Sequence, residues 1–140
     1  MKQNGQSLVE FAISLMMILI LLTGAVEISL ALFEYVTMRD VAQEGALYGS
    51  INPTDTAGIQ NRVIAAASDV LALTPSDITI TYSNSAKKCE GITSGVPNSI
   101  TVTITRPHQI IMPIVGTFLG GQQINMSANV TDTILTPTCH

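Results

Sequence analysis

Residues 5–26 read GQSLVEFAISLMMILILLTGAV, and this stretch determines the architecture of the chain. From Phe11 to Val26 no residue is charged, and almost all are apolar. As a helix with about 1.5 Å rise per residue, residues 8–26 would span about 28 Å, close to the ~30 Å hydrocarbon core of a bilayer. Glu10 does not suit a plain anchor, because a carboxylate near bilayer depth costs about 2.5 kcal/mol or more. We therefore expect a helix that rests in a membrane and later packs with copies of itself.

Length and composition leave room for one small domain beyond this helix. The chain has 140 residues, of which 11% are charged, and its net charge is -4. Roughly 90 residues remain for a domain outside the membrane, which is enough for one small core. The acidic balance argues against a nucleic-acid partner, which requires a basic surface.

The residues before the helix predict its orientation. Lys2 is the only charged side chain before Glu10. By the positive-inside tendency, the N-terminus stays in the cytoplasm and the rest of the chain lies outside. A secretory signal peptide fits poorly, because its apolar core would be shorter, about 7–15 residues. A simple uncleaved anchor is the remaining alternative, and it leaves Glu10 without an explanation.

The order of residues around Gly5 resembles the leader and cleavage region of type IV pilins, and most closely that of the TadE-like pseudopilins of tight-adherence (Flp-type) pili. The resemblance implies that a prepilin peptidase cuts between Gly5 and Gln6 and removes residues 1–5 as a leader. Glu10 and Phe11 would then be the fifth and sixth residues of the mature chain, where the family has Glu followed by Tyr or Phe. Gln6 differs from the Phe or Met that ordinary type IV pilins place first, whereas a variable first residue suits the tight-adherence branch.

Glu10 has a physical role in such a subunit. After cleavage Gln6 would carry a free α-ammonium group, and a carboxylate in the first turn interacts favourably with the positive end of a helix. In a filament, the Glu10 carboxylate could pair with the α-ammonium group of a neighbouring subunit, which would offset part of its desolvation cost. We expect Glu10 to control assembly and register.

The helical pattern continues past the membrane segment, residues 6–26, to about Tyr48. Five residues form the predicted apolar face of this outer half: Leu30, Phe33, Thr37, Val41 and Tyr48. Five charged residues occupy much of the rest: Glu27, Glu34, Arg39, Asp40 and Glu44. This spacing indicates an amphipathic helix that belongs to an outer domain, residues 27–140.

Two glycines lie inside the predicted helix. Gly45 is expected where the helix packs closely against a sheet. Gly24 has two readings: a close contact with another helix, or a point where the helix bends on leaving the bilayer.

A second helix and a sheet are predicted after the spine. Asp55 is suited to cap a helix over Thr56 to about Leu73, with Val70 on its apolar stripe. Alternating runs at residues 78–82, 100–104 and 124–130 predict strands with threonine on one face and aliphatic side chains on the other. The third run could extend to Ile134.

The remaining segments are connections. Arg106-Pro107 is expected to close the second strand. Residues 83–99 form a long loop rich in Gly, Ser and Asn, and such loops are often functional or mobile. Residues 110–119 are apolar but interrupted by Pro113 and Gly116, so they either cover the sheet edge or form a turn of helix.

The predicted fold is therefore α+β, with a long spine helix, a second helix and a small antiparallel sheet of three or four strands. The resemblance to TadE-like proteins implies that this sheet packs on the outer half of the spine.

Few residues offer chemistry. Cys89 and Cys139 are the only cysteines, and in an exported domain we expect them to form a disulfide, worth about 4 kcal/mol for a loop of some 50 residues. His108 and His140 have no partners at metal-ligand spacing, so no metal site is expected. No nucleophile elbow or phosphate loop occurs, which predicts a protein that is not an enzyme and needs no cofactor. Asn125 and Asn129 begin glycosylation triplets, which we interpret as ordinary strand residues.

The predicted function is that of a structural pilin-like subunit, a minor one at the tip or at initiation of a tight-adherence pilus. The resemblance implies an inner-membrane location before assembly and a cell-surface pilus afterwards. It also implies four kinds of partner: other pilin subunits, the prepilin peptidase, the assembly platform and membrane lipid. The alternative is a membrane-anchored extracytoplasmic binding domain that never polymerises.

Overall fold

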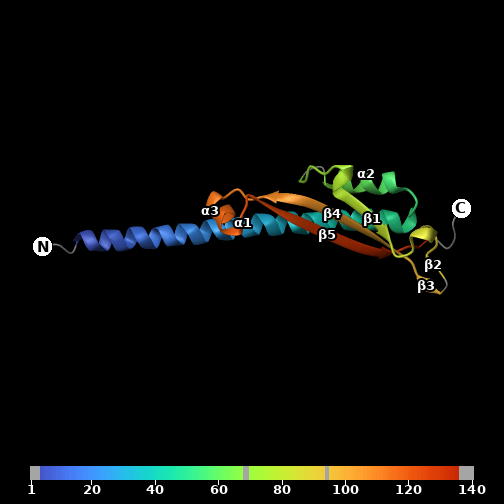
Figure 1. Ribbon diagram of the computed structural model, residues 1–140, viewed down its shortest axis with the longest axis horizontal. Helices are drawn as coiled ribbons and strands as arrows, with labels where there is room; N and C mark the ends of the chain where they lie inside the picture. The colour runs from blue at the N-terminus through green and yellow to red at the C-terminus, as the bar shows by residue number, and fades with distance from the viewer. Residues whose placement is uncertain (1–3, 68–69, 94, 136–140) are drawn as a thin grey trace. The chain divides into compact units, whose positions relative to one another are not determined.

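The computed structural model describes residues 4–67, 70–93 and 95–135. One long helix, α1 (Asn4–Ile51), begins the chain (Figure 1). The chain divides into two compact units, Met1–Leu32 with His108–Ile124 and Phe33–Pro107 with Asn125–His140. We refer to them as the first and second units.

The second unit has an α+β fold, as predicted. It contains the outer part of α1, helix α2 (Thr56–Ala67), and strands β1 (Ile78–Tyr82), β4 (Ser99–Gln109) and β5 (Gln123–Thr133), of which β4 and β5 run on into the first unit. The three strands form one sheet in the order β1-β4-β5, and β1 is antiparallel to β4 with Ile78 opposite Ile104 and Tyr82 opposite Ile100.

The core of the second unit lies between α1, α2 and the sheet. Its fully buried members include Met38, Ala42 and Ala46 of α1, Ile59 and Val63 of α2, and Ile100, Val102 and Ile104 of β4. On the opposite face of the sheet, Thr101 Oγ1 and Thr131 Oγ1 lie 2.8 Å apart. The alternation of threonine and aliphatic residues thus identified the buried face correctly.

The buried face of α1 differs from the predicted one. Val41 is buried and Tyr48 packs against the core, as predicted. Leu30 and Phe33 are exposed, however, and Met38, Ala42 and Ala46 are buried instead. Small residues line this face because α2 approaches α1 closely: a Cβ at Gly45 would collide with Val63 and would lie 3.5 Å from Val102. The close contact expected at Gly45 is real, but α2 makes the tighter approach and the sheet the looser one.

Helix α2 begins as predicted and ends earlier. Asp55 Oδ1 accepts the Gly58 N–H at 2.9 Å, which is the expected N-terminal cap. The helix ends at Ala67, and the N–H groups of Val70 and Leu71 both donate to the Ala67 carbonyl in the turn that follows. Val70 is therefore exposed, contrary to the predicted stripe.

Strand β4 runs past the point where Pro107 was expected to end it. The register with β1 stops at Ile104, so Pro107 lies beyond the end of that partner strand. A proline can occupy such a position because its missing N–H removes no bond from the β1 ladder.

The loop at residues 83–99 contains more structure than predicted. It holds a short 3-10 turn, η2 (Ser85–Lys87), and a hairpin of strands β2 (Ile92–Thr93) and β3 (Val96–Pro97). Another 3-10 turn, η1 (Pro75–Asp77), precedes β1.

The first unit combines the N-terminal part of α1 with the segment His108–Ile124. Of the two readings of residues 110–119, the helical turn is correct, since helix α3 covers Pro113–Leu119. Gly120 follows it with φ of 78°, a left-handed conformation that favours glycine at the end of a helix.

Candidate membrane and assembly helix

The N-terminal part of α1 has almost no cover from the rest of the chain. Every residue from 5 to 22 is exposed, including Phe11, Met16 and Leu21, which is 73% exposed. Each large apolar side chain left in water forgoes about 1.5–3 kcal/mol relative to burial. The segment therefore requires lipid or other protein around it.

The helix is also long enough to cross a membrane. By length and composition, α1 is one candidate span among the described residues. Helix α1 continues through Gly24 without a break, and a Cβ at Gly24 would meet nothing within 4 Å. No close contact with the described residues accounts for Gly24, and the bend on leaving the bilayer stays a prediction.

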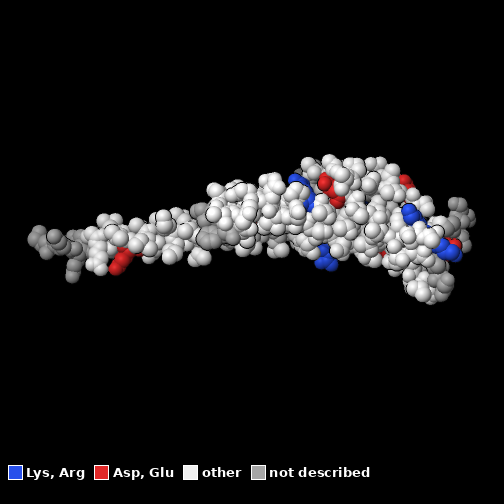
Figure 2. Space-filling view, viewed as in Figure 1, with Lys and Arg blue, Asp and Glu red and all other residues white. Residues whose placement is uncertain are grey.

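Glu10 lies on the exposed surface of this apolar segment. Glu10 is the only charged residue between positions 4 and 26, and Figure 2 shows acidic atoms on this white part of the molecule. None of the described residues forms an ion pair with Glu10. Its neighbour Phe11 is 65% exposed. The two predicted assembly residues thus lie together on a surface that no other part of the described chain covers.

Gly5 and Gln6 lie in the first turns of α1 and are exposed. The helix begins at Asn4, earlier than the predicted start near Leu8. Processing between Gly5 and Gln6 stays a prediction.

The N-terminal helix carries the match to known proteins. Residues 5–47 match the family model of TadE-like proteins. This part of the chain is similar to TadE-like proteins. The matched range falls within α1, so the identification depends on the spine and not on α2 or the sheet. A comparison with curated proteins and with solved structures finds no match.

The first unit contains a buried carboxylate that the sequence did not reveal. Glu27 is 5% exposed, although the helical pattern placed it on the solvent face. Its Oε1 accepts the Ile111 N–H at 3.1 Å, and its Oε2 accepts the Met112 N–H at 3.3 Å. His108 Nε2 lies 3.6 Å from Glu27 Oε1 and is equally buried. The carboxylate therefore holds the chain just ahead of α3 against α1.

Glu34 also differs from its predicted place on the solvent face. In the second unit, Arg106 Nε lies 3.4 Å from Glu34 Oε1, and the Glu34 side chain is largely buried. Glu27 and Glu34 could not be recognised from helical periodicity, because their partners come from residues more than 70 positions later in the chain.

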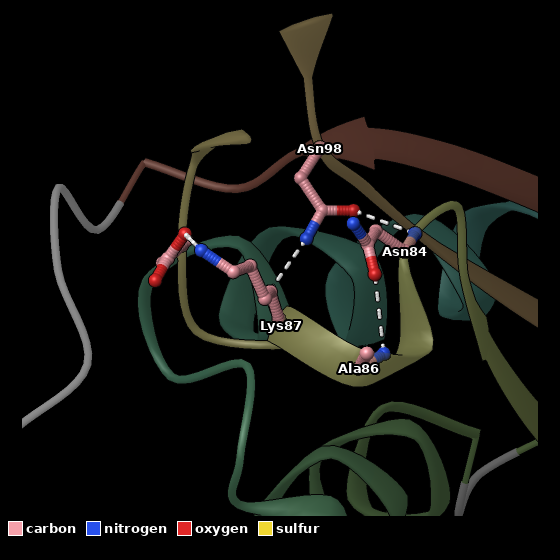
Figure 3. A network of polar contacts seen from close by, with 5 residues as sticks. Asn84, Ala86, Lys87 and Asn98 are labelled. Atoms are coloured by element: carbon pink, nitrogen blue, oxygen red, sulfur yellow. Dashed lines mark hydrogen bonds and ion pairs between the residues drawn. The ribbon is translucent and has the colours of Figure 1, made fainter. Parts of the chain in front are cut away.

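A polar network around Asn98 orders the loop that was expected to be mobile or functional (Figure 3). The buried Asn98 side chain accepts bonds at Oδ1 from Ser83 Oγ at 2.6 Å and from the Asn84 N–H at 3.0 Å. Its Nδ2 donates to the Lys87 carbonyl at 2.9 Å. Lys87 in turn forms an ion pair with Glu90 at 2.9 Å.

The remaining predicted sites lie partly outside the described residues. Cys89 is half-buried in this loop, but Cys139 is not among the described residues, so the disulfide stays a prediction. His140 also lies outside them, and His108 contacts Glu27. Within residues 4–67, 70–93 and 95–135, no three His, Cys, Asp or Glu side chains gather as metal ligands would.

Proposed function

We propose that this TadE-like protein is a structural subunit of a tight-adherence pilus, trimmed after Gly5 and built into the filament through α1. The family implies a part in the assembly of tight-adherence pili. The observation that carries the proposal is the exposed apolar helix from residue 5 to residue 22, which bears a single carboxylate.

The helix suits two successive environments. In the inner membrane, lipid would surround its apolar side chains while the outer domain lies outside the cytoplasm. In a filament, neighbouring copies of the helix or of other pilin subunits would replace the lipid. Glu10 would pair there with the α-ammonium group at Gln6 of a neighbour, and an unpaired Glu10 would be strongly disfavoured in that apolar core.

The small folded domain supports a minor subunit at the tip or at initiation. Shaft pilins of this branch, by the same resemblance, are much shorter and lack such a domain. Quantifying the subunits of whole purified pili tests this point: an amount similar to that of the main fibre protein would contradict a minor role.

The processing step is tested by N-terminal sequencing of the protein recovered from cells that assemble the pilus. A mature chain that begins at Gln6 is the expected result. A chain that keeps residues 1–5 would favour the alternative function, a membrane-anchored binding domain that never polymerises.

The role of Glu10 is tested separately by counting pili in cells that carry Glu10→Gln. We expect strongly reduced incorporation of the subunit with unchanged membrane insertion. Glu44→Gln is the matched control, because Glu44 is an exposed residue of the same helix that pairs with the exposed Arg62. Normal assembly of Glu10→Gln would contradict the register role.

A further inference from the structure

We propose that residues 110–119, the segment that contains α3, rest in the headgroup region of the bilayer that holds α1. This inference depends on the membrane stage of the proposed function, and it assigns a lipid-binding surface to a segment outside the spanning helix. Its partner is the outer leaflet of a phospholipid bilayer.

The position of the segment along α1 comes from Glu27. Glu27 follows directly after the uncharged run that ends at Val26, so it marks the outer end of the membrane span. Because its two carboxylate oxygens accept the N–H groups of Ile111 and Met112, the chain just before α3 is fixed at that level. Figure 1 shows α3 beside this part of α1.

The segment also reaches slightly below that level. Residues 5–22 of α1 are exposed, whereas Thr23 and Gly24 are half-buried and Glu27 is buried. Thr23 precedes Val26 by three residues, or about 4.5 Å of helix rise, which is less than the thickness of one headgroup layer. The first unit therefore gains cover at the depth where the hydrocarbon core gives way to headgroups.

The composition of the segment suits this depth. No Asp, Glu, Lys or Arg occurs between Arg106 and Asp132, so none has to be desolvated at the membrane. The side chains of Ile111 and Leu119 are 65% and 59% exposed. Apolar groups on a short surface element typically enter the boundary between headgroups and acyl chains.

The same segment also shields the Glu27 side chain at the edge of the membrane. A bare carboxylate at the edge of the hydrocarbon core would be costly, and two N–H groups and His108 surround this one. A second copy of the chain could also cover Ile111 and Leu119. The fixed level of the segment at the end of the span favours lipid, which every inserted copy meets before it meets another subunit.

The experiment uses tryptophan as a depth reporter, because the chain contains no tryptophan. Leu119→Trp is introduced into the full chain, and the protein is placed at low density in vesicles of phosphatidylethanolamine and phosphatidylglycerol. Lipids brominated either near the headgroup or near the chain end then quench any tryptophan at the matching depth.

Two control variants carry the same substitution at exposed leucines of α1. Leu21→Trp, at a site that is 73% exposed, lies inside the span and reports whether α1 inserts. Leu47→Trp, at a site that is 54% exposed, lies in the second unit, 20 residues after Glu27 in the sequence. Its emission shows whether a tryptophan substitution alone is enough to bring an exposed site into contact with lipid.

We expect the Leu119→Trp emission to shift to shorter wavelength and to be quenched more by the shallow bromines than by the deep ones. Leu21→Trp should be quenched by the deep bromines, and Leu47→Trp by neither. Unquenched Leu119→Trp beside quenched Leu21→Trp would overturn the inference and leave membrane insertion intact. If Leu21→Trp is also unquenched, the membrane stage of the proposed function fails and the inference fails with it.

A shift that appears only at high protein density, without quenching, would assign the surface to a second copy and would also overturn the inference. A second experiment uses the chain without substitutions, so that no tryptophan can influence the result. A lipid-soluble carbene probe should label peptides from residues 110–119 in the same vesicles, and absence of that label would contradict contact with lipid.

Discussion

Glu27 Oε1 and His108 Nε2 lie 3.6 Å apart, and both side chains are almost completely buried. Glu27 belongs to the spine helix α1, and His108 is the second-last residue of strand β4. The contact therefore joins parts of the chain that are 81 positions apart. The same carboxylate also accepts two backbone N–H groups, from Ile111 and Met112. One side chain thus joins α1 to the segment just before α3.

Replacing Glu27 should release the segment that it holds. Glu27→Ala leaves the N–H groups of Ile111 and Met112 without their acceptor at a buried side chain, and we expect a loss of about 2–4 kcal/mol in the local opening free energy. Hydrogen exchange of the protein in detergent micelles measures this at the Ile111 and Met112 amides. The exposed pair of Glu44 and Arg62 supplies the control, since Glu44→Ala should cost less than about 1 kcal/mol. Equal protection of the two amides in Glu27→Ala and the parent would contradict the anchoring role.

Gly45 and Gly24 form a matched pair within one helix. A Cβ at Gly45 collides with Val63, so Gly45→Ala should destabilise the second unit by about 1–3 kcal/mol. A Cβ at Gly24 meets nothing within 4 Å, so Gly24→Ala should be neutral or stabilise the helix by up to about 1 kcal/mol. Thermal unfolding of both variants in the same detergent gives the comparison. Similar effects at the two positions would show that helix propensity, not packing, decides the outcome.

Asn98 should be essential for the order of the loop at residues 83–99. Asn98→Ala removes the acceptor of the Ser83 hydroxyl and the Asn84 N–H, and it removes the donor to the Lys87 carbonyl. We expect a loss of about 2–3 kcal/mol, because these groups lie around a fully buried side chain. Asn129→Ala, at an exposed position of β5, is the control. The claim fails if exchange at the Asn84 and Ser99 amides is unchanged in Asn98→Ala.

The stability of the turn before β1 should depend on pH. The hydroxyl and backbone N–H of Thr74 both donate to Asp77 Oδ2, and these bonds lower the pKa of the Asp77 carboxyl below its ordinary value. A carboxyl whose pKa is lower in the folded state stabilises the fold above its unfolded pKa, and this contribution disappears as the pH falls through the folded pKa. The loss is therefore expected below about pH 4.

Unfolding of Asp77→Asn and the parent at a series of pH values checks this prediction. The difference in stability between the two should be constant near neutral pH and should shrink as the pH falls below about 4. Thr74→Ser keeps the hydroxyl donor and should behave like the parent. A difference that does not change with pH would mean that the Asp77 carboxylate contributes nothing through its charge.

The sequence predicted the elements of this fold where local pattern decides them. The apolar run at residues 5–26 required a helix, the Asp55 cap appeared where expected, and alternation identified the buried face of β4. The resemblance to TadE-like proteins also came from this local pattern, since the residues that carry it are contiguous.

The predictions failed where the environment of a residue comes from distant parts of the chain. Leu30 and Phe33 looked like core residues but are exposed, because α2 packs instead on a face of small residues around Gly45. A run of small residues at helical spacing, Ala42, Gly45, Ala46 and Gly49, is the signal that could have revealed this close approach.

The sequence by itself determined the apolar spine, the start of α2, the three strands of the main sheet and the resemblance of the spine to TadE-like proteins, because hydrophobic periodicity acts over a few neighbouring residues. Only the tertiary structure decided that Glu27 is buried and that residues 108–112 close over it. The physical reason is that burial of a charge depends on the partners that surround it, and those partners are 81 or more positions away along the chain.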